Sequence, residues 1–551
     1  MEKTFKIAFL GGVDEFGENL TCYYDENDGF LVDFGAMFPD YYHHGVTYFY
    51  PDYDFITRRY EKFKVLFVTH GHEDHIGAIV NIVNKIPLRI IASKYTIALI
   101  KRKLMVAGKV NFYPKLEEAE NLSEYNVGKF KVKFIENDHS IIDSYSLKIS
   151  YDNNVNIFHS SDFKVDKKSS KTVNFMNNLA KFAKNVDVAL IDSTNANIDY
   201  DINMSEERVK HSIKKIIEDA PQNVFITMFS SNIERIINLT DIVSQLDIPI
   251  VFLGRSLDKY TKLAEEINVK INKKKIVSII EYNELLKENE DLKVVFIIAG
   301  SQGELTSALT NIAYNQYKGV FINPGDIVIY SSKTIPGNEK DILKVKNQIL
   351  KKGAKLISVR NDDRVHASGH SNAEGLREVI NLIKPKNLIP VHGTLLQQTA
   401  LKEIAVEEGV KNVKIPSLGD IFIFTDGIVK YHRTIELKRR FLDITGFDDM
   451  EFSLLKERDK LKLGVAVISL IIDKRDYFLF KRPLIELKGF VDDKYLNKIK
   501  DKLEVEVFKS LEKSDLSKEE ELTQSLTLQI KRFFRKNYNI SPYLIILKEY
   551  I

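Results

Sequence analysis

Three histidines and an aspartate lie within six residues, in the stretch His-Gly-His-Glu-Asp-His at positions 70–75. The stretch follows an apolar run at residues 64–69, which is typical of a buried strand. His70 and His72 are two positions apart, so their side chains can point the same way at a strand end. Imidazole and carboxylate groups at such close quarters are typical of a metal site and suit zinc or manganese. The alternative is a polar loop that caps a helix.

A catalytic metal site needs more ligands than this stretch supplies, and isolated candidates occur at the ends of later apolar strands. They are His139, Asp162 and His392. A sheet presents its functional loops at the carboxyl ends of its strands. Any one of these residues alone would be explained as structural, but together with the first stretch they favour a site for two metal ions.

We expect two divalent ions, with zinc as the first choice and manganese or magnesium as alternatives. A lone carboxylate suits the position between two metals about 3.5–4 Å apart, and Asp162 is the candidate. Asp33 is the expected acceptor for the second nitrogen of a ligand imidazole. His159 lies three residues before Asp162 and should face away from the site on a regular strand. The remaining expected ligands are His70, His72 and His139 for one ion, and Asp74, His75 and His392 for the other.

The elements that must position these residues fall into blocks along the chain. Residues 1–208 mix strands and helices around a central sheet, and residues 361–433 return to that pattern. Between them, residues 209–360 alternate regularly between strand and helix, which indicates a separate parallel sheet. Residues 434–456 are charged and weakly periodic, so we expect a linker. Residues 457–551 are expected to form a small α+β domain.

Composition bounds the class of protein. A chain of 551 residues has room for several domains of about 150 residues each. The longest apolar run, residues 464–472, is far shorter than the ~18 residues that cross a bilayer, so no membrane association is expected. A single cysteine excludes an internal disulfide and suits a reducing compartment, the cytoplasm. The formal charge of +3 means that any surface for a polyanion must be local.

The order of the candidate ligands resembles the metallo-β-lactamase superfamily: His-x-His-x-Asp-His, a lone His, a lone Asp and a late His. The late His follows the inserted block, which is the arrangement of the β-CASP nucleases. Blocks at 11–17, 335–339 and 390–393 (Gly-Gly-Val-Asp-Glu-Phe-Gly, Ile-Pro-Gly-Asn-Glu and Pro-Val-His-Gly) are similar to bacterial ribonuclease J. The resemblance implies an α/β fold: an αββα metallo-β-lactamase sandwich, an inserted parallel-sheet β-CASP domain and a C-terminal α+β dimerisation domain.

The resemblance also places residues around the expected metals. Asp192 matches the family's acidic strand-end residue, and His370 matches its histidine after the insert. We expect His370, Asp74 and Asp192 to act in catalysis. The loop that ends at His370 could bind an anion through its side chains and its backbone at Gly369. Residues 230–235 begin a helix that could bind phosphate, although a plain N-cap is an alternative. The expected substrate-binding residues are Ser231, Asn232, Arg235, His366, Ala367, Ser368, Gly369 and His370.

The activity that the resemblance implies is that of a 5′→3′ exoribonuclease that prefers 5′-monophosphorylated, single-stranded RNA and also cuts internally, in mRNA decay and rRNA maturation. In the expected mechanism, a hydroxide activated by the two metals attacks the phosphodiester. A homodimer or tetramer is implied, or an assembly with a paralogous subunit. Two alternatives stay open. The complete ligand set argues against a non-catalytic subunit of an RNA-degrading complex, and the long insert argues against a small-molecule metallo-hydrolase.

Overall fold

The computed structural model divides into two compact units, which are described one at a time. The first unit comprises residues 1–42 and 46–448, and the second comprises residues 43–45 and 449–551. None of the described helices combines the length and the apolar character that crossing a bilayer requires. The structure describes all residues except 1–3, 40–42, 109, 199–204, 336, 449 and 490–492.

Two sheets face each other in the first unit. Their inner faces share one core, in which Phe9, Phe67 and Leu147 are fully buried. The eight-stranded sheet runs in the order β22 (Ile428–Thr434), β21 (Asp420–Thr425), β1 (Phe5–Gly11), β2 (Leu20–Tyr24), β3 (Gly29–Val32), β5 (Phe63–Phe67), β6 (Arg89–Ser93) and β7 (Lys115–Ala119). The seven-stranded sheet runs in the order β20 (Asn412–Val413), β19 (Asn387–Val391), β12 (Val188–Asp192), β11 (Val155–His159), β10 (Tyr145–Tyr151), β9 (Phe130–Glu136) and β8 (Glu124–Val127).

Helices cover the outer face of each sheet, which completes an αββα sandwich. Strand β1 shows why: Ile7 and Phe9 enter the core between the sheets, whereas Ala8 and Leu10 enter the core beneath the outer helices. Alternate residues of a strand point to opposite faces, so a strand covered on both sides is apolar throughout. The outer helices are α3 (Ile79–Val83) and α4 (Lys94–Ala107) on the first sheet, and α5 (Ser170–Phe182), α12 (Ala373–Ile383) and α13 (Leu395–Glu407) on the second.

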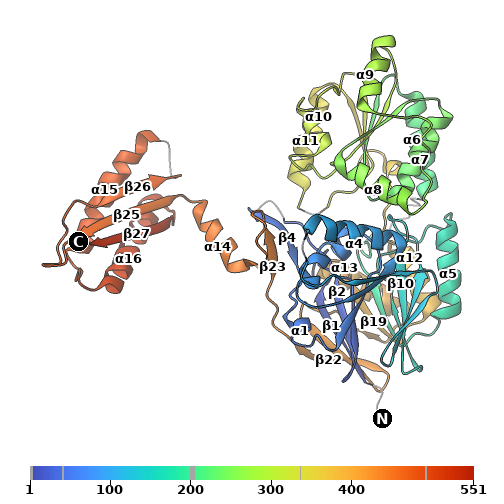
Figure 1. Ribbon diagram of the computed structural model, residues 1–551, viewed down its shortest axis with the longest axis horizontal. Helices are drawn as coiled ribbons and strands as arrows, with labels where there is room; N and C mark the ends of the chain where they lie inside the picture. Colours follow the sequence, from blue (N-terminus) through green and yellow to red (C-terminus); the bar gives the residue numbers. More distant parts are fainter. Residues whose placement is uncertain are drawn as a thin grey trace. The chain divides into compact units, whose positions relative to one another are not determined.

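A six-stranded parallel sheet forms the insert between β12 and β19. Helices α6 (Glu206–Asp219), α7 (Ile233–Gln245) and α8 (Arg255–Glu266) pack on one of its faces (Figure 1). Helices α9 (Ile279–Glu288), α10 (Ala308–Ala313) and α11 (Glu339–Lys351) pack on the other. The strand order is β15 (Ile276–Val277), β14 (Ile250–Leu253), β16 (Val295–Ile298), β13 (Val224–Thr227), β17 (Ile327–Tyr330) and β18 (Lys355–Ser358).

We expected residues 434–456 to form a linker, but part of this segment belongs to a sheet, so the prediction is corrected. Strand β23 (Arg440–Asp443) pairs antiparallel with β4 (Val46–Tyr50). Phe441 is fully buried, and Arg440 forms ion pairs with Asp52 and Asp54. The charge of Arg440, which contributed to the prediction of an open linker, is therefore paired within a packed segment.

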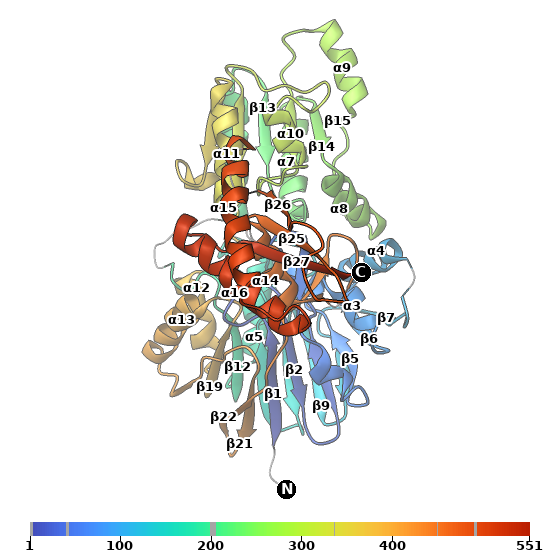
Figure 2. The same cartoon turned by 90° about the vertical axis from the view of Figure 1, so that its left-hand side faces the viewer.

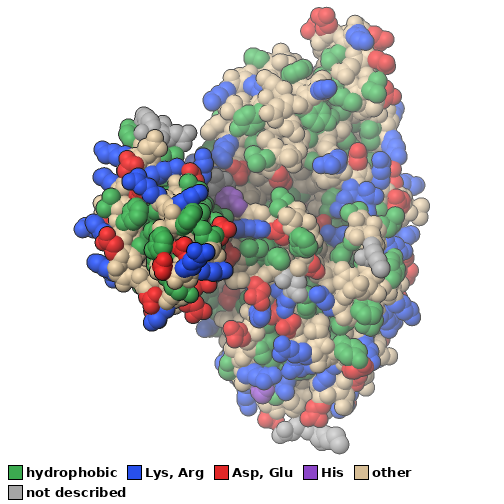
Figure 3. Space-filling view, turned by 60° about the vertical axis from the view of Figure 1, so that its left-hand side comes forward, with side chains coloured by type: hydrophobic (Ala, Val, Ile, Leu, Met, Phe, Trp, Pro, Cys, Tyr) green, Lys and Arg blue, Asp and Glu red, His purple; other side chains and the backbone are tan. Residues whose placement is uncertain are grey.

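The second unit is a three-stranded sheet with two helices on one face (Figure 2). Its strands are β26 (Leu484–Lys488), β25 (Val465–Ile472) and β27 (Tyr543–Tyr550), and its helices include α14 (Phe452–Leu461), α15 (Asp493–Leu511) and α16 (Glu519–Tyr538). Every second residue of β25 is buried against α15 and α16. Figure 3 shows Lys and Arg side chains interspersed with acidic and hydrophobic ones over the face in view, in keeping with the small net charge.

Candidate metal centre

The candidate ligands converge at the carboxyl ends of strands that belong to both sheets. His70 follows β5, and Asp74 and His75 lie in the short helix α2 (Glu73–Ile76). From the second sheet, His139 follows β9, Asp162 follows β11 and His392 follows β19. Three non-glycine residues beside the site, Asp33, Ser161 and His392, have φ values of 61°, 52° and 55°. Left-handed backbone at such residues is strained and tends to occur at functional sites.

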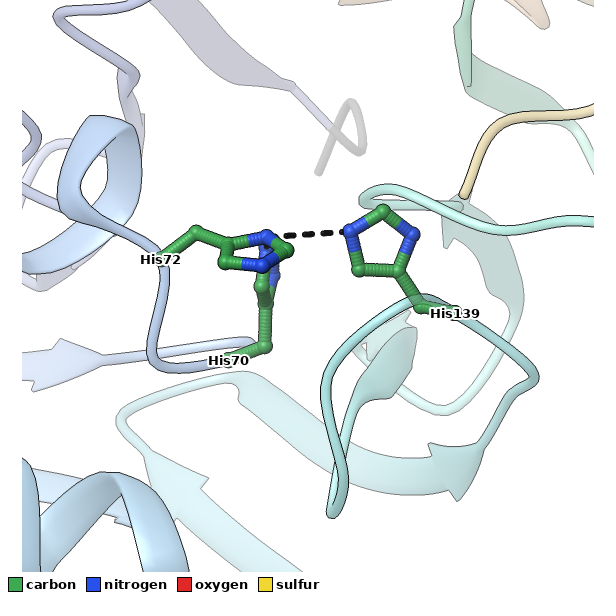
Figure 4. A group of neighbouring side chains, drawn as sticks. All are labelled: His70, His72 and His139. Atoms are coloured by element: carbon green, nitrogen blue, oxygen red, sulfur yellow. Dashed lines mark hydrogen bonds between the residues drawn. The ribbon is translucent and has the colours of Figure 1, made fainter. Parts of the chain in front are cut away.

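Three imidazoles form the first group, and their nitrogen atoms point at one another (Figure 4). His72 Nδ1 lies 3.1 Å from His70 Nε2 and 3.1 Å from His139 Nε2. Two nitrogens on a tetrahedral zinc ion with bonds of ~2.0–2.1 Å would lie about 3.3–3.4 Å apart. Burial lowers the pKa of His72 to about 4 and those of His70 and His139 well below the usual range. The three rings are therefore neutral and can offer lone pairs to a metal.

The second group contains Asp74, His75, Asp162 and His392. His392 Nε2 lies 3.1 Å from Asp74 Oδ2, and His75 Nε2 lies 3.2 Å from Asp162 Oδ2. The same Asp162 oxygen is 3.7 Å from His70 Nε2, so it lies between the two groups. Burial lowers the pKa of His392, but Asp162 and Asp74 outweigh it and raise that pKa to about 9. These carboxylates therefore favour a positive charge between them, and a bound metal ion would supply that charge.

Each of the five histidines in the two groups has its other ring nitrogen held by a further partner. Such outer partners fix the orientation of a metal-binding imidazole. A cluster that only packed histidines together would not need this arrangement. The partners are Thr69 Oγ1 for His70 Nδ1, Ser231 Oγ for His72 Nε2, the Gly369 carbonyl for His139 Nδ1, Asp33 Oδ2 for His75 Nδ1 and Thr194 Oγ1 for His392 Nδ1.

Asp33→Asn tests this outer shell. Asp33 Oδ2 lies 2.8 Å from His75 Nδ1, and the same carboxylate accepts hydrogen bonds from the backbone and hydroxyl of Thr69. We expect about a 10–100-fold loss of metal affinity, because the neutral amide weakens the basicity and orientation of His75. Metal titration of the full-length protein measures the effect. Asp426→Asn, in an exposed turn that also has a positive φ, is the control and should match the wild type.

Asp192 and His370 form a pair beside the two groups. His370 Nδ1 lies 2.7 Å from Asp192 Oδ2. The other carboxylate oxygen accepts hydrogen bonds from the backbone and hydroxyl of Thr194, at 2.9 and 2.6 Å. The His370 side chain is 21% exposed, whereas those of His70 and His75 are at most 3% exposed. His370 is therefore held in a fixed orientation but stays accessible to a substrate.

The residues expected to bind substrate lie in different environments. Ser368 and His370 line a polar pocket, whereas His366 and Ala367 are buried. Gly369 packs so closely that a Cβ there would lie 2.6 Å from Ser140 Oγ and 2.8 Å from His139 Cε1. In the segment at 230–235, the Ser231 hydroxyl contacts His72, and the Asn232 side chain accepts a hydrogen bond from the Arg235 backbone N–H. The N-cap explanation therefore fits Asn232.

We expected Arg235 to bind substrate, and this prediction is corrected, because its guanidinium is not available to a phosphate. It is 2% exposed and donates to both carboxylate oxygens of Glu206, at 2.6 and 3.2 Å. It also donates to the carbonyl oxygens of Ser331, at 2.8 Å, and Ala367, at 3.3 Å. Arg235 thus fixes two loops that border the site. No sequence pattern indicated this role, because its partner Glu206 lies on another helix.

An αββα sandwich with a His/Asp site at its strand ends and a parallel-sheet insert defines a metallo-hydrolase of the metallo-β-lactamase fold, β-CASP type. Residues 221–349 match the family model for the ribonuclease J beta-CASP domain. Residues 359–416 match that for the Zn-dependent metallo-hydrolase RNA specificity domain, and 453–548 that for the ribonuclease J C-terminal domain. The chain belongs to the ribonuclease J family and is a metal-dependent ribonuclease.

Curated relatives extend the likeness over most of the chain. It is 32% identical to Ribonuclease J of Corynebacterium glutamicum over 89% of this chain and 68% of that protein. It is 31% identical to Ribonuclease J2 of Bacillus subtilis, over 88% and 87% of the two chains, and 28% identical to Ribonuclease J of Mycoplasma genitalium, over 98% and 96%. The chain is also similar to a solved structure from Enterococcus faecalis V583, which is described as a protein of unknown function. The match covers 76% of this chain and 100% of that one, with a TM-score of 0.55. The identity is 15%, so this likeness shows the fold alone.

Proposed function

We propose that this ribonuclease degrades single-stranded RNA in the 5′→3′ direction, prefers a 5′-monophosphate and also cuts internally, in mRNA decay and rRNA maturation in the cytoplasm. The observation that carries the proposal is the polar pocket that shares His370 with the candidate metal centre. A terminal 5′-phosphate in that pocket would place the next phosphodiester beside His370 and the metal-binding groups. The names of the relatives support the class of substrate.

We also propose that the two groups of side chains hold two zinc ions, with manganese or magnesium as alternatives. Neutral imidazoles in one group, and carboxylates with imidazoles in the other, are the donors that such ions take. When bound, two divalent ions would activate a water and neutralise charge on the phosphodiester. Asp162 would contact both ions, because one of its oxygens lies between the groups.

His370 is the proposed proton donor to the 3′-oxygen that leaves the phosphorus. Asp192 holds Nδ1 of the ring, so Nε2 is the nitrogen that faces substrate. Asp74 is the remaining residue that we expect to act in catalysis, and it would do so by binding a metal beside His392.

His370→Ala is expected to slow cleavage by about 10²–10⁴-fold, which is the usual contribution of a positioned general acid. Binding of RNA should change far less, because His370 supplies one contact among several. Single-turnover rates on a defined RNA, with affinity measured by fluorescence anisotropy, separate the two effects. A variant that cleaves at the wild-type rate would contradict the assignment. His432→Ala, on the exposed strand β22, is the matched control.

A time course on RNA labelled at each end tests the function as a whole. The expected product of 5′-monophosphorylated RNA is mononucleotides released from the 5′ end, with few internal fragments. RNA with a 5′-hydroxyl should be degraded more slowly. Internal fragments alone, at equal rates on both substrates, would contradict the proposed direction. Elemental analysis of the same preparation identifies the metal.

We also propose that the chain forms a homodimer or tetramer, or assembles with a paralogous subunit, through its C-terminal unit. The sheet face opposite α15 and α16 carries exposed apolar side chains, among them Leu484, Ile545 and Leu547. Apolar side chains gathered on one face favour a protein contact. Light scattering of the full chain, with Leu547→Glu as the disrupting variant, measures the state of assembly.

A further inference from the structure

Three lysines line the pocket that contains Ser368 and His370, and two of them are already neutralised. Lys164 Nζ lies 3.4 Å from Asp138 Oδ1. Lys167 Nζ lies 2.9 Å from Glu374 Oε1 and 2.7 Å from Glu378 Oε1. The positive charge of each is thus balanced within the protein, and neither needs a ligand.

Lys333 is the third lysine, and it differs in its partners. It follows β17, and its carbonyl accepts a hydrogen bond of 2.9 Å from Gln302 Nε2, which fixes the backbone. Its ammonium donates to Asn195 Oδ1 at 3.1 Å, and no carboxylate among the described residues forms an ion pair with it. Burial lowers the pKa of Lys333, as expected for a cation without an acidic partner. A partly buried cation without a counter-ion is costly, so an anion from outside would be bound favourably here.

The surroundings of Lys333 supply further donors for such an anion. Ser371 is 4% exposed and lines the pocket, yet its hydroxyl has no hydrogen-bond partner among the residues that the structure describes. Asn372, the N-cap of the eleven-residue helix α12, also lines the pocket, and the Glu374 carboxylate beside it is already paired with Lys167. A helix N-terminus, a hydroxyl and an ammonium together match a phosphate group.

Asn195 connects this position to the proposed proton donor. Its amide nitrogen donates to Ser368 Oγ at 2.9 Å and to the His370 carbonyl at 3.0 Å, while its oxygen accepts from Lys333. Ser368 Oγ in turn accepts from the His370 backbone N–H at 3.2 Å. A phosphate bound at Lys333 therefore joins the hydrogen-bond network that holds the His370 loop.

We propose that Lys333 is a specificity-determining residue of this ribonuclease: its ammonium binds the 5′-terminal phosphate of RNA, together with Ser371. This inference rests on the 5′-monophosphate preference proposed above. It assigns the discrimination between a phosphate and a hydroxyl at the 5′ end to one lysine that no carboxylate neutralises. Lys164 and Lys167, in the same pocket, have no such part.

The test compares cleavage of one RNA that carries either a 5′-monophosphate or a 5′-hydroxyl, using the full-length protein. Lys333→Gln should lower kcat/KM on the monophosphate by about 10–100-fold, the usual worth of a hydrogen bond to a charged group. Its rate on the 5′-hydroxyl RNA should stay near that of the wild type. Lys333→Arg, which keeps the charge, should retain most of the preference. Lys167→Met is the matched control and should behave like the wild type.

A binding measurement supports the rates without requiring cleavage. Uridine 5′-monophosphate should bind the wild type more tightly than uridine does, and Lys333→Gln should remove most of that difference. Inorganic phosphate, as a third ligand, shows whether the phosphate group alone suffices. Thermal unfolding shows whether each variant is folded. If Lys333→Gln is not folded, Lys333→Met serves as a second variant that removes the charge.

Two results would overturn the inference, and they are distinguishable. If the wild type prefers the monophosphate and a folded Lys333→Gln keeps the same ratio of rates, only the role of Lys333 is wrong. If the wild type shows no preference for the monophosphate, both the proposed 5′-end preference and the role of Lys333 are wrong.

Discussion

Asp162→Asn should abolish RNA cleavage and lower the bound metal. The carboxylate oxygen of Asp162 lies 3.2 Å from His75 Nε2, 3.6 Å from His392 Nε2 and 3.7 Å from His70 Nε2. The same oxygen is 3.9 Å from His139 Nε2, so it lies close to both candidate metal groups. Metal ions supply several kcal/mol of charge stabilisation, so we expect a loss of at least about a thousandfold.

The fold should survive this change, because Asn occupies nearly the same volume as Asp. The measurement is a single-turnover rate with metal content by elemental analysis, and thermal unfolding in chelator compares the folds without metal. Asp152→Asn, in an exposed turn after β10, is the matched control and should retain full activity. Wild-type cleavage by a folded Asp162→Asn protein would refute the two-metal assignment.

Arg235→Met should cost about 3–5 kcal/mol of the free energy of unfolding, because it leaves Glu206 buried without its partner. The two side chains are 2% and 7% exposed and are joined by two hydrogen bonds. The same guanidinium holds the carbonyls of Ser331 and Ala367, so the pocket should loosen too. Urea unfolding followed by circular dichroism measures the loss.

Lys171→Met is the matched control for Arg235→Met. It removes the partner of Glu234, the residue just before Arg235, in an ion pair whose side chains are 36% and 33% exposed. Exposed pairs contribute about 0–1 kcal/mol, so little should change. Adding Glu206→Gln to Arg235→Met should recover part of the stability by removing the unpaired charge. A loss no larger than that of Lys171→Met would contradict the buried-pair explanation.

The Arg235–Glu206 pair also predicts a dependence on pH. Burial raises the pKa of Glu206, but Arg235 and Lys164 outweigh it and lower that pKa from 4.5 to about 2. A carboxylate with a lowered pKa stabilises the fold above its ordinary pKa, and this contribution fades as the pH falls from 4.5 toward 2. The difference in unfolding free energy between the wild type and Glu206→Gln should therefore shrink as the pH is lowered through this window.

The sandwich and its parallel-sheet insert were predicted correctly from the sequence, and the structure brings the candidate ligands close together, both for a physical reason. His392 directly follows β19 and His70 lies three residues after β5, and strand ends bring distant segments together at one edge. Local pattern and chain order were enough to group them. Asp33 could be identified in the same way, because it also follows an apolar strand. The structure places it beside His75.

Other features could not be read from the sequence, because they depend on packing between segments. Glu206 pairs with Arg235 only once α6 and α7 lie side by side. Lys333 is one lysine among many, and its lack of an acidic partner is a property of the folded pocket. The linker prediction was wrong for a similar reason: Arg440 appears solvated until Asp52 and Asp54 are beside it.

Strand pairing across the insert bears on how the protein is made. β12 pairs with β19, from Val188 opposite Asn387 to Asp192 opposite Val391, and β1 pairs with β21, with Phe5 opposite Phe424. A chain still on the ribosome lacks these partners until residues beyond 424 have emerged, whereas the insert has all of its strands by Ser358. Domains fold as units during synthesis. The insert should therefore fold first, and the catalytic sandwich should be exposed to chaperones and proteases until late in translation.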